Sequence, residues 1–115
     1  MVLSSKDCPR REACIQGGKG IVKMKDLATP EQMYQNARLF THIQLDPGCS
    51  IGYHTHTGET EFYYILKGEA VLNDNGTEVL MHTGDVSATG YGEGHSLENR
   101  TDETVELMAL IVLDR

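Results

Sequence analysis

The chain has 115 residues, 39% of them hydrophobic, and a formal net charge of −7. A chain of this length forms one modest core, so we expect a single domain over residues 1–115. The acidic balance argues against nucleic-acid binding, which depends on lysine and arginine neutralising phosphates. The only basic run, Pro9 to Arg11, is too short for a groove-binding stripe and is interpreted as a solvated turn.

The sequence shows no basic segment followed by an apolar run at its start, and the run from Leu107 to Leu113 is too short to cross a bilayer. We therefore expect a cytoplasmic protein without a membrane partner. The cysteines at positions 8, 14 and 49 are odd in number and lack a CxxC spacing. They are expected to be reduced thiols.

Short segments rich in β-branched and aromatic residues alternate with glycine and asparagine, which predicts an all-β sandwich or barrel. In chain order we expect strands over residues 21–25, 39–45, 61–66, 70–72, 77–81, 95–99 and 105–113. The one helix-like window, Pro30 to Arg38, has Thr29 as a candidate N-cap and forms at most two helical turns, or a loop. The Asn73–Gly76 segment predicts a tight hairpin, because Asn and Gly tolerate positive φ.

Two histidines one residue apart, His54 and His56, precede two glutamates, Glu59 and Glu61. Residues i and i+2 of a strand face the same side, so both imidazoles can point at one site. Glu61 begins the next predicted strand, whereas Glu59 lies in a predicted loop from Thr57 to Thr60. Imidazole and carboxylate together suit divalent transition metals. A bare His-x-His is also common as a solvent-facing pair on a polar strand, so both interpretations stay open at this point.

The spacing around these residues resembles two motifs of the cupin family. The first is Gly, five residues, His-x-His, three or four residues, Glu, six residues, Gly, and it matches residues 48–68. The second is Gly, five residues, Pro-x-Gly, two residues, His, three residues, Asn, and it matches residues 84–99. The one departure is Gly90, where the family usually has proline, and we expect a looser turn there. On these two motifs the chain is identified as a member of the cupin family.

The resemblance implies a double-stranded β-helix, the jelly-roll barrel, with a short N-terminal extension. Residues 1–38 would form an N-terminal arm and first strand, and residues 39–113 the conserved barrel. The resemblance selects Glu61 over Glu59 as a metal ligand and supplies His95 as the fourth. The other marked positions of the motifs are interpreted as residues that shape the turns or support the ligands without binding the metal: Asn99, Gly48, Gly68, Gly84 and Gly92.

Three imidazoles and one carboxylate leave two adjacent positions open in an octahedral shell, which admit water, O₂ or a bidentate oxygen ligand. We expect one divalent transition metal per chain, Mn or Fe, with Zn, Ni and Co as alternatives. The chain looks most like single-domain cupins that resemble half of an oxalate decarboxylase. This predicts a metal-dependent decarboxylase, dioxygenase or isomerase acting on a small carboxylate or oxygenated substrate. The alternatives are a non-catalytic module that binds a sugar or small acid, and a structural zinc site.

Catalysis at the open positions requires a group that transfers protons. The candidates are Glu59, Glu93, and Tyr53 or Tyr63, although the pattern favours surface carboxylates for the two glutamates and also fits Tyr63 as a barrel-filling aromatic. His42 and His82 match no ligand position and are predicted to point away from the interior. Family resemblance and the exposed sheets of a small barrel favour a homodimer.

Overall fold

The computed structural model describes all residues from 1 to 115. Its only helical element is one 3-10 turn, η1 (Ser5–Asp7). The strands are β1 (Arg10–Ala13), β2 (Val22–Asp26), β3 (Ala37–Leu45), β4 (Ser50–Thr55), β5 (Glu59–Lys67), β6 (Ala70–Asp74), β7 (Thr77–Met81), β8 (Val86–Gly90), β9 (Gly94–Glu98) and β10 (Val105–Leu113). The structure contains no helix with the length and apolarity that a membrane span requires.

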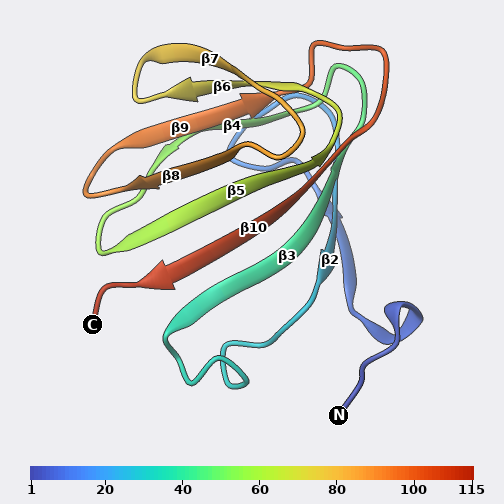
Figure 1. Cartoon of the computed structure of the whole chain (residues 1–115), viewed down its shortest axis with the longest axis vertical. Coiled ribbons are helices and arrows are strands. Elements are labelled where there is room, and N and C mark those ends of the chain that lie inside the picture. Colours follow the sequence, from blue (N-terminus) through green and yellow to red (C-terminus); the bar gives the residue numbers. More distant parts are fainter.

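The strands form two antiparallel sheets that pack against each other (Figure 1). One sheet has six strands in the order β1-β2-β3-β10-β5-β8, and the other has four in the order β4-β9-β6-β7. From β3 to β10 the chain alternates between the sheets, except where β6 and β7 form a hairpin within one sheet. The predicted all-β jelly-roll is confirmed.

The inner face of the six-stranded sheet changes from apolar to polar along the strands. Near one end, a row of buried apolar residues pairs in register across four strands: Met24, Ile43, Leu107 and Ile65. Four residues further along β10, the corresponding row starts with the apolar Leu39 and Ile111 and continues with two buried polar residues, Glu61 and Thr89. The apolar end holds the hydrophobic core, and the polar end lines a site between the sheets.

A β-bulge in β4 turns His54 into the barrel. Ile51 pairs with Leu97 and His54 pairs with His95, and the register shifts between these two pairs. Side chains alternate along a strand, so residues 51 and 54 would face opposite sides of a regular strand. The extra residue lets both face inward. At the bulge, the amide of Gly52 donates to the carbonyl of Ile15 at 3.0 Å, so the N-terminal segment packs directly on β4.

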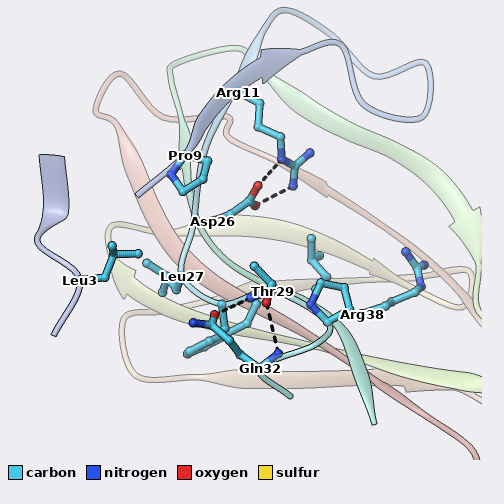
Figure 2. A pocket seen from close by; sticks show the side chains of 12 residues that line it. Leu3, Pro9, Arg11, Asp26, Leu27, Thr29, Gln32 and Arg38 are labelled. Carbon is cyan, nitrogen blue, oxygen red and sulfur yellow. Dashed lines mark hydrogen bonds and ion pairs between the residues drawn. The ribbon is translucent and has the colours of Figure 1, made fainter. Parts of the chain in front are cut away.

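The basic run near the N-terminus is not the solvated turn that we expected. Arg10 and Arg11 begin β1, an edge strand that pairs with β2. Arg11 stands opposite the buried Met24 and therefore faces the barrel side, where two hydrogen bonds of 2.8 and 2.9 Å join its guanidinium to Asp26 (Figure 2). The expectation was wrong because pairing with β2, rather than local composition, makes this charged segment a strand.

The window from Pro30 to Arg38 forms turns and no helix. Thr29 and Gln32 exchange hydrogen bonds of 2.9 and 3.2 Å, the reciprocal pattern that often starts a helix (Figure 2). Tyr34 and Gln35 then both adopt a φ of 56°, which is incompatible with continuing a right-handed helix. Of the two alternatives, the loop is correct.

The hairpin between β6 and β7 is confirmed. Asp74 pairs with Thr77, so the turn consists of Asn75 and Gly76, whose φ values are 50° and 102°. Two consecutive residues with positive φ define the turn type that suits a two-residue hairpin loop.

Gly90 does not loosen a turn, contrary to our expectation. It ends β8, a strand that the sequence pattern did not reveal, and it lies buried against the start of β5. A Cβ atom at Gly90 would lie 2.4 Å from Oγ1 of Thr60 and 2.8 Å from the carbonyl oxygen of Glu59. Glycine is therefore required here by close backbone approach.

Candidate metal centre

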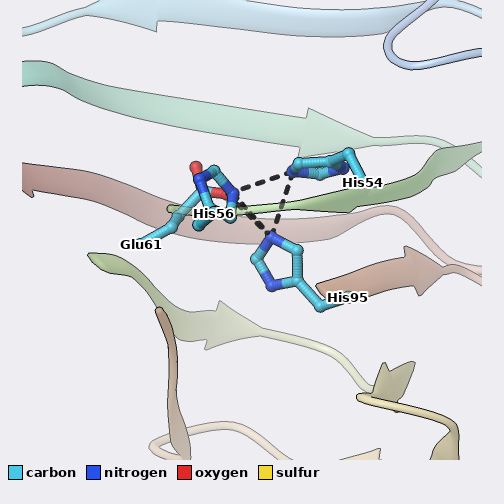
Figure 3. Close-up of side chains that lie close together, drawn as sticks. All are labelled: His54, His56, Glu61 and His95. Atoms are coloured by element: carbon cyan, nitrogen blue, oxygen red, sulfur yellow. Dashed lines mark hydrogen bonds and ion pairs between the residues drawn. The ribbon is translucent and has the colours of Figure 1, made fainter. Parts of the chain in front are cut away.

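Four side chains from both sheets converge at the polar end of the barrel (Figure 3). They are His54 on β4, His56 just after β4, Glu61 on β5 and His95 on β9. Five separations among the three Nε2 atoms and Oε1 of Glu61 lie between 2.9 and 3.5 Å. Ligand atoms held about 2.1 Å from one ion stand about 3.0–3.4 Å apart, so these distances suit a shared ion.

The imidazoles of His54 and His56 are oriented to present lone pairs to this point. Nδ1 of His54 lies 2.7 Å from the carbonyl oxygen of Gly52, and Nδ1 of His56 lies 2.5 Å from Oε2 of Glu59. Both partners are acceptors, so each neutral ring carries its proton on Nδ1 and leaves Nε2 unprotonated. Two lone pairs then face the carboxylate of Glu61 across 3.1 and 3.5 Å. This arrangement is repulsive unless a cation or proton lies between them.

The electrostatics of the cluster fit a divalent cation. Burial raises the pKa of Glu61, but its polar contacts with the imidazoles of His54 and His95 outweigh this and lower the pKa to about 2. Burial lowers the pKa of His95, which keeps that ring neutral and able to bind a metal. Burial also opposes charge on His54, yet Glu61 and the Gly52 carbonyl raise its pKa overall. A metal ion competes with the proton on His54, so metal affinity falls as the pH decreases.

Glu59 binds His56 through Nδ1, the ring nitrogen that faces away from the other ligands. It is the first residue of β5, so its expected place in a loop was wrong; pairing with Leu113 of β10 extends the strand by two residues beyond its predicted start. Its carboxylate accepts two hydrogen bonds of 2.7 Å from the guanidinium of Arg38 as well as contacting His56. The hydrogen bond from Arg38, followed by that from His56, lowers the pKa of Glu59 to about 2.

Two other proton-transfer candidates lie in different surroundings. Tyr63 is buried and stacks on His95, with ring centroids 4.6 Å apart and an interplanar angle of 2°. Burial, reinforced by the charge of Glu61, raises the pKa of Tyr63 well above its usual value. The side chain of Glu93 is exposed in the turn between β8 and β9, and its carbonyl oxygen accepts the amide proton of His56.

A cavity of about 220 Å³ opens onto the cluster. Its lining includes His54, His56 and Glu61 together with two arginines, Arg11 and Arg38. Sequence reasoning did not identify either arginine as a site residue. Arg38 is 21 residues from Glu59, and only the pairing of strands brings the two together. No local motif signals such a contact.

The remaining marked positions lie in turns and loops. Asn99 is fully buried, and its amide donates to the carbonyls of Leu45 and Glu103 at 2.8 and 2.7 Å while its oxygen accepts from Thr101. Asn99 thus joins the end of β3 to the loop that precedes β10. Four motif glycines share a positive φ: Gly48, Gly68, Gly84 and Gly92. Of the other histidines, His42 pairs with Glu106 and His82 is exposed.

Comparison with known proteins agrees with the motifs. The family model described as Cupin domain matches residues 41–112. The oxalate-binding protein of Thermotoga maritima is 47% identical over 113 residues, covering 98% of this chain and 93% of that protein. The crystal structure of a predicted oxalate decarboxylase from Thermotoga maritima superposes with a TM-score of 0.93 at 45% identity, covering 98% of this chain and 99% of that one.

A more distant solved structure supports the fold alone. It is a sugar phosphate isomerase of the cupin superfamily from Silicibacter pomeroyi, with a TM-score of 0.77 at 22% identity, covering 97% of this chain and 75% of that one. The barrel, the converging ligand set and these matches lead to one conclusion. The chain belongs to the cupin domain family.

Proposed function

We propose that the protein holds one divalent transition metal, Mn or Fe, and binds a small dicarboxylate of the oxalate type there. The observation that supports a bound metal is that imidazole lone pairs face the buried carboxylate of Glu61. A cation between them would stabilise this arrangement. His54, His56, Glu61 and His95 would hold the ion. When bound, the metal supplies Lewis acidity toward oxygen ligands at positions that the protein leaves free.

The lining of the cavity supports an anionic ligand. Arg11 and Arg38 each use Nε and Nη2 to bind a carboxylate, Asp26 and Glu59 respectively. Guanidinium carries five N–H donors, so each arginine keeps donors on Nη1 for a further acceptor. A volume of about 220 Å³ suits a small molecule. The 47% identical relative is named for oxalate binding, which agrees with this ligand class.

The side chains around the cavity favour binding over proton-transfer catalysis. Glu59, with its pKa of about 2 and its bonds to Arg38 and His56, is a weak base at neutral pH. Tyr63 stays protonated because its pKa is raised. An oxalate decarboxylase activity is the second candidate, favoured by the likeness to the solved structure that carries this description.

The function is tested on protein purified without immobilised nickel. Elemental analysis of the purified chain should give about one equivalent of transition metal. Calorimetric titration of Mn²⁺-loaded protein should show oxalate binding, with acetate and a neutral sugar binding far more weakly. Oxalate binding of equal strength to chelator-treated protein would contradict the proposal. Formation of formate and CO₂ from oxalate would establish the enzyme instead of the binding module.

Replacing Glu59 by Gln is expected to weaken Mn²⁺ binding about 10- to 100-fold, because the partner that orients His56 loses its charge. Calorimetry with the metal alone measures the change. Glu106→Gln is the matched control, since it alters another carboxylate–histidine pair, with His42, outside the barrel. Equal metal affinity in Glu59→Gln and wild type would show that Glu59 does not support the site.

We also propose that the protein is a homodimer in the cytoplasm. The outer face of the six-stranded sheet carries apolar side chains in two adjacent cross-strand rows: Phe40, Leu110, Phe62 and Ala88, then Met108, Tyr64 and Val86. Val86 is 63% exposed and Tyr64 44% exposed. Such a face suits an interface that repeats on both copies. Sedimentation velocity of the intact chain tests the dimer.

A further inference from the structure

The three ligand histidines differ in what holds their Nδ1 atoms. A backbone carbonyl holds that of His54 and the carboxylate of Glu59 holds that of His56. Nδ1 of His95 has no hydrogen-bond partner, although the residue is fully buried. A buried polar atom without a partner is rare in folded proteins and calls for a physical explanation.

Two further buried side-chain atoms share this property, and both are hydroxyl oxygens on β8: Ser87 Oγ and Thr89 Oγ1. No other buried side-chain nitrogen or oxygen in the chain lacks a partner. Thr89 is completely buried, and both hydroxyl residues occupy inward-facing positions of the strand, alternating with the exposed Val86 and Ala88.

The strand register places these hydroxyls beside the two residues of β5 that contact His95. Thr89 pairs with Glu61, whose Oε1 lies 2.9 Å from Nε2 of His95. Ser87 pairs with Tyr63, whose ring stacks on that of His95. Directly paired residues on one face of an antiparallel sheet have Cβ atoms about 5 Å apart. The hydroxyls therefore flank the two residues that touch His95 from the six-stranded sheet.

We propose that Thr89, assisted by Ser87, is the positioning residue for His95. Its hydroxyl oxygen holds one buried water molecule in place, and this water is the acceptor for the Nδ1 proton. That water accepts from Nδ1 of His95 and donates one hydrogen to each hydroxyl oxygen. This satisfies all three unpartnered atoms with the three hydrogen bonds that are typical of an internal water. The proton stays on Nδ1, and Nε2 keeps its lone pair for the metal.

The inference rests on the proposed metal site, but its first test does not require metal. Nitrogen NMR of metal-free protein labelled with ¹⁵N-histidine reports the tautomer of each ring. We expect His95 to be protonated on Nδ1 in the wild type and in Thr89→Ser, which keeps the hydroxyl. In Thr89→Val, which has nearly the same shape and no hydroxyl, we expect a mixture of tautomers. An unchanged tautomer in Thr89→Val would overturn the proposal.

The second test is the affinity for Mn²⁺ alone, measured by calorimetry. We expect Thr89→Val to bind about 10- to 100-fold more weakly and Thr89→Ser to bind within about threefold of wild type. Thr104→Val is the matched control: Thr104 is partly buried, its hydroxyl donates to Oδ1 of Asp46 at 3.0 Å, and it does not line the cavity beside the ligand set. Its metal affinity should not change.

The outcomes separate the two proposals. If the wild type binds no metal, the proposed function fails, whatever the tautomer of His95. If the wild type binds metal and Thr89→Val binds it equally well, only the role of Thr89 fails. If Thr89→Val folds poorly, Ser87→Ala removes the other hydroxyl that binds the proposed water. Its His95 tautomer and its Mn²⁺ affinity are then measured in the same way. Wild-type behaviour of Ser87→Ala in both would exclude the shared water.

Discussion

Replacement of Glu61 by Gln is expected to weaken divalent-metal binding by at least about 100-fold while the fold survives. A complete four-ligand zinc site contributes about 10–16 kcal/mol, so one ligand accounts for about 3 kcal/mol, which corresponds to about 100-fold. Gln has nearly the shape of Glu and removes the only negative charge among the four ligands. Calorimetry with Mn²⁺ alone measures the loss, and circular dichroism reports the fold.

Glu69→Gln is the control for this substitution. It makes the same change in net charge at an exposed carboxylate outside the ligand set. Its metal affinity should match the wild type within about twofold. If Glu61→Gln also binds Mn²⁺ with wild-type affinity, the four converging side chains do not form the metal site.

Gly52→Ala is expected to lower the free energy of unfolding by about 3 kcal/mol and to weaken metal binding. The added Cβ atom would lie 2.0 Å from the carbonyl oxygen of Gln16 and 2.9 Å from the amide nitrogen of Gly18. Both are backbone atoms, so the N-terminal segment or the bulge must move. Because the carbonyl of Gly52 holds Nδ1 of His54, the displacement also disturbs a ligand. Urea denaturation and Mn²⁺ titration measure the two effects.

Gly17→Ala provides the comparison, one residue from the contact. A Cβ atom there meets nothing within 4 Å, and the residue has a φ of +71°. Its cost is therefore conformational strain alone, about 1 kcal/mol. A loss in Gly52→Ala no larger than that in Gly17→Ala would mean that residues 15–18 are not held against β4.

Strands with alternating apolar residues and clear turn signals could be predicted from the sequence, whereas β1 and β8, the edge strands of the six-stranded sheet, could not. The residues of β1, Arg10 to Ala13, are mostly charged, and those of β8, Val86 to Gly90, are mostly small. Neither has a local pattern that demands a strand. Each becomes one because a neighbour, β2 or β5, offers a free row of backbone donors and acceptors.

The four converging residues could be named from motif spacing, but the groups that support them could not. The contact of Arg38 with Glu59 depends on the pairing of Glu59 with Leu113, which extends β5 along the last residues of β10. The inward direction of His54 depends on a bulge, which an alternation rule applied from Ile51 would have missed. Spacing along the chain identifies which side chains act together, while long-range pairing decides which neighbours hold them.

The distribution of the four ligands over both sheets has a mechanical consequence. Glu61 belongs to the six-stranded sheet, whereas His54 and His95 belong to the four-stranded one. A bound ion would link the two sheets at the polar end of the barrel, in addition to the stacking of Tyr63 on His95. Opening of that end would then require release of the ion. Resistance to heat and proteolysis should rise with the logarithm of metal concentration above the dissociation constant.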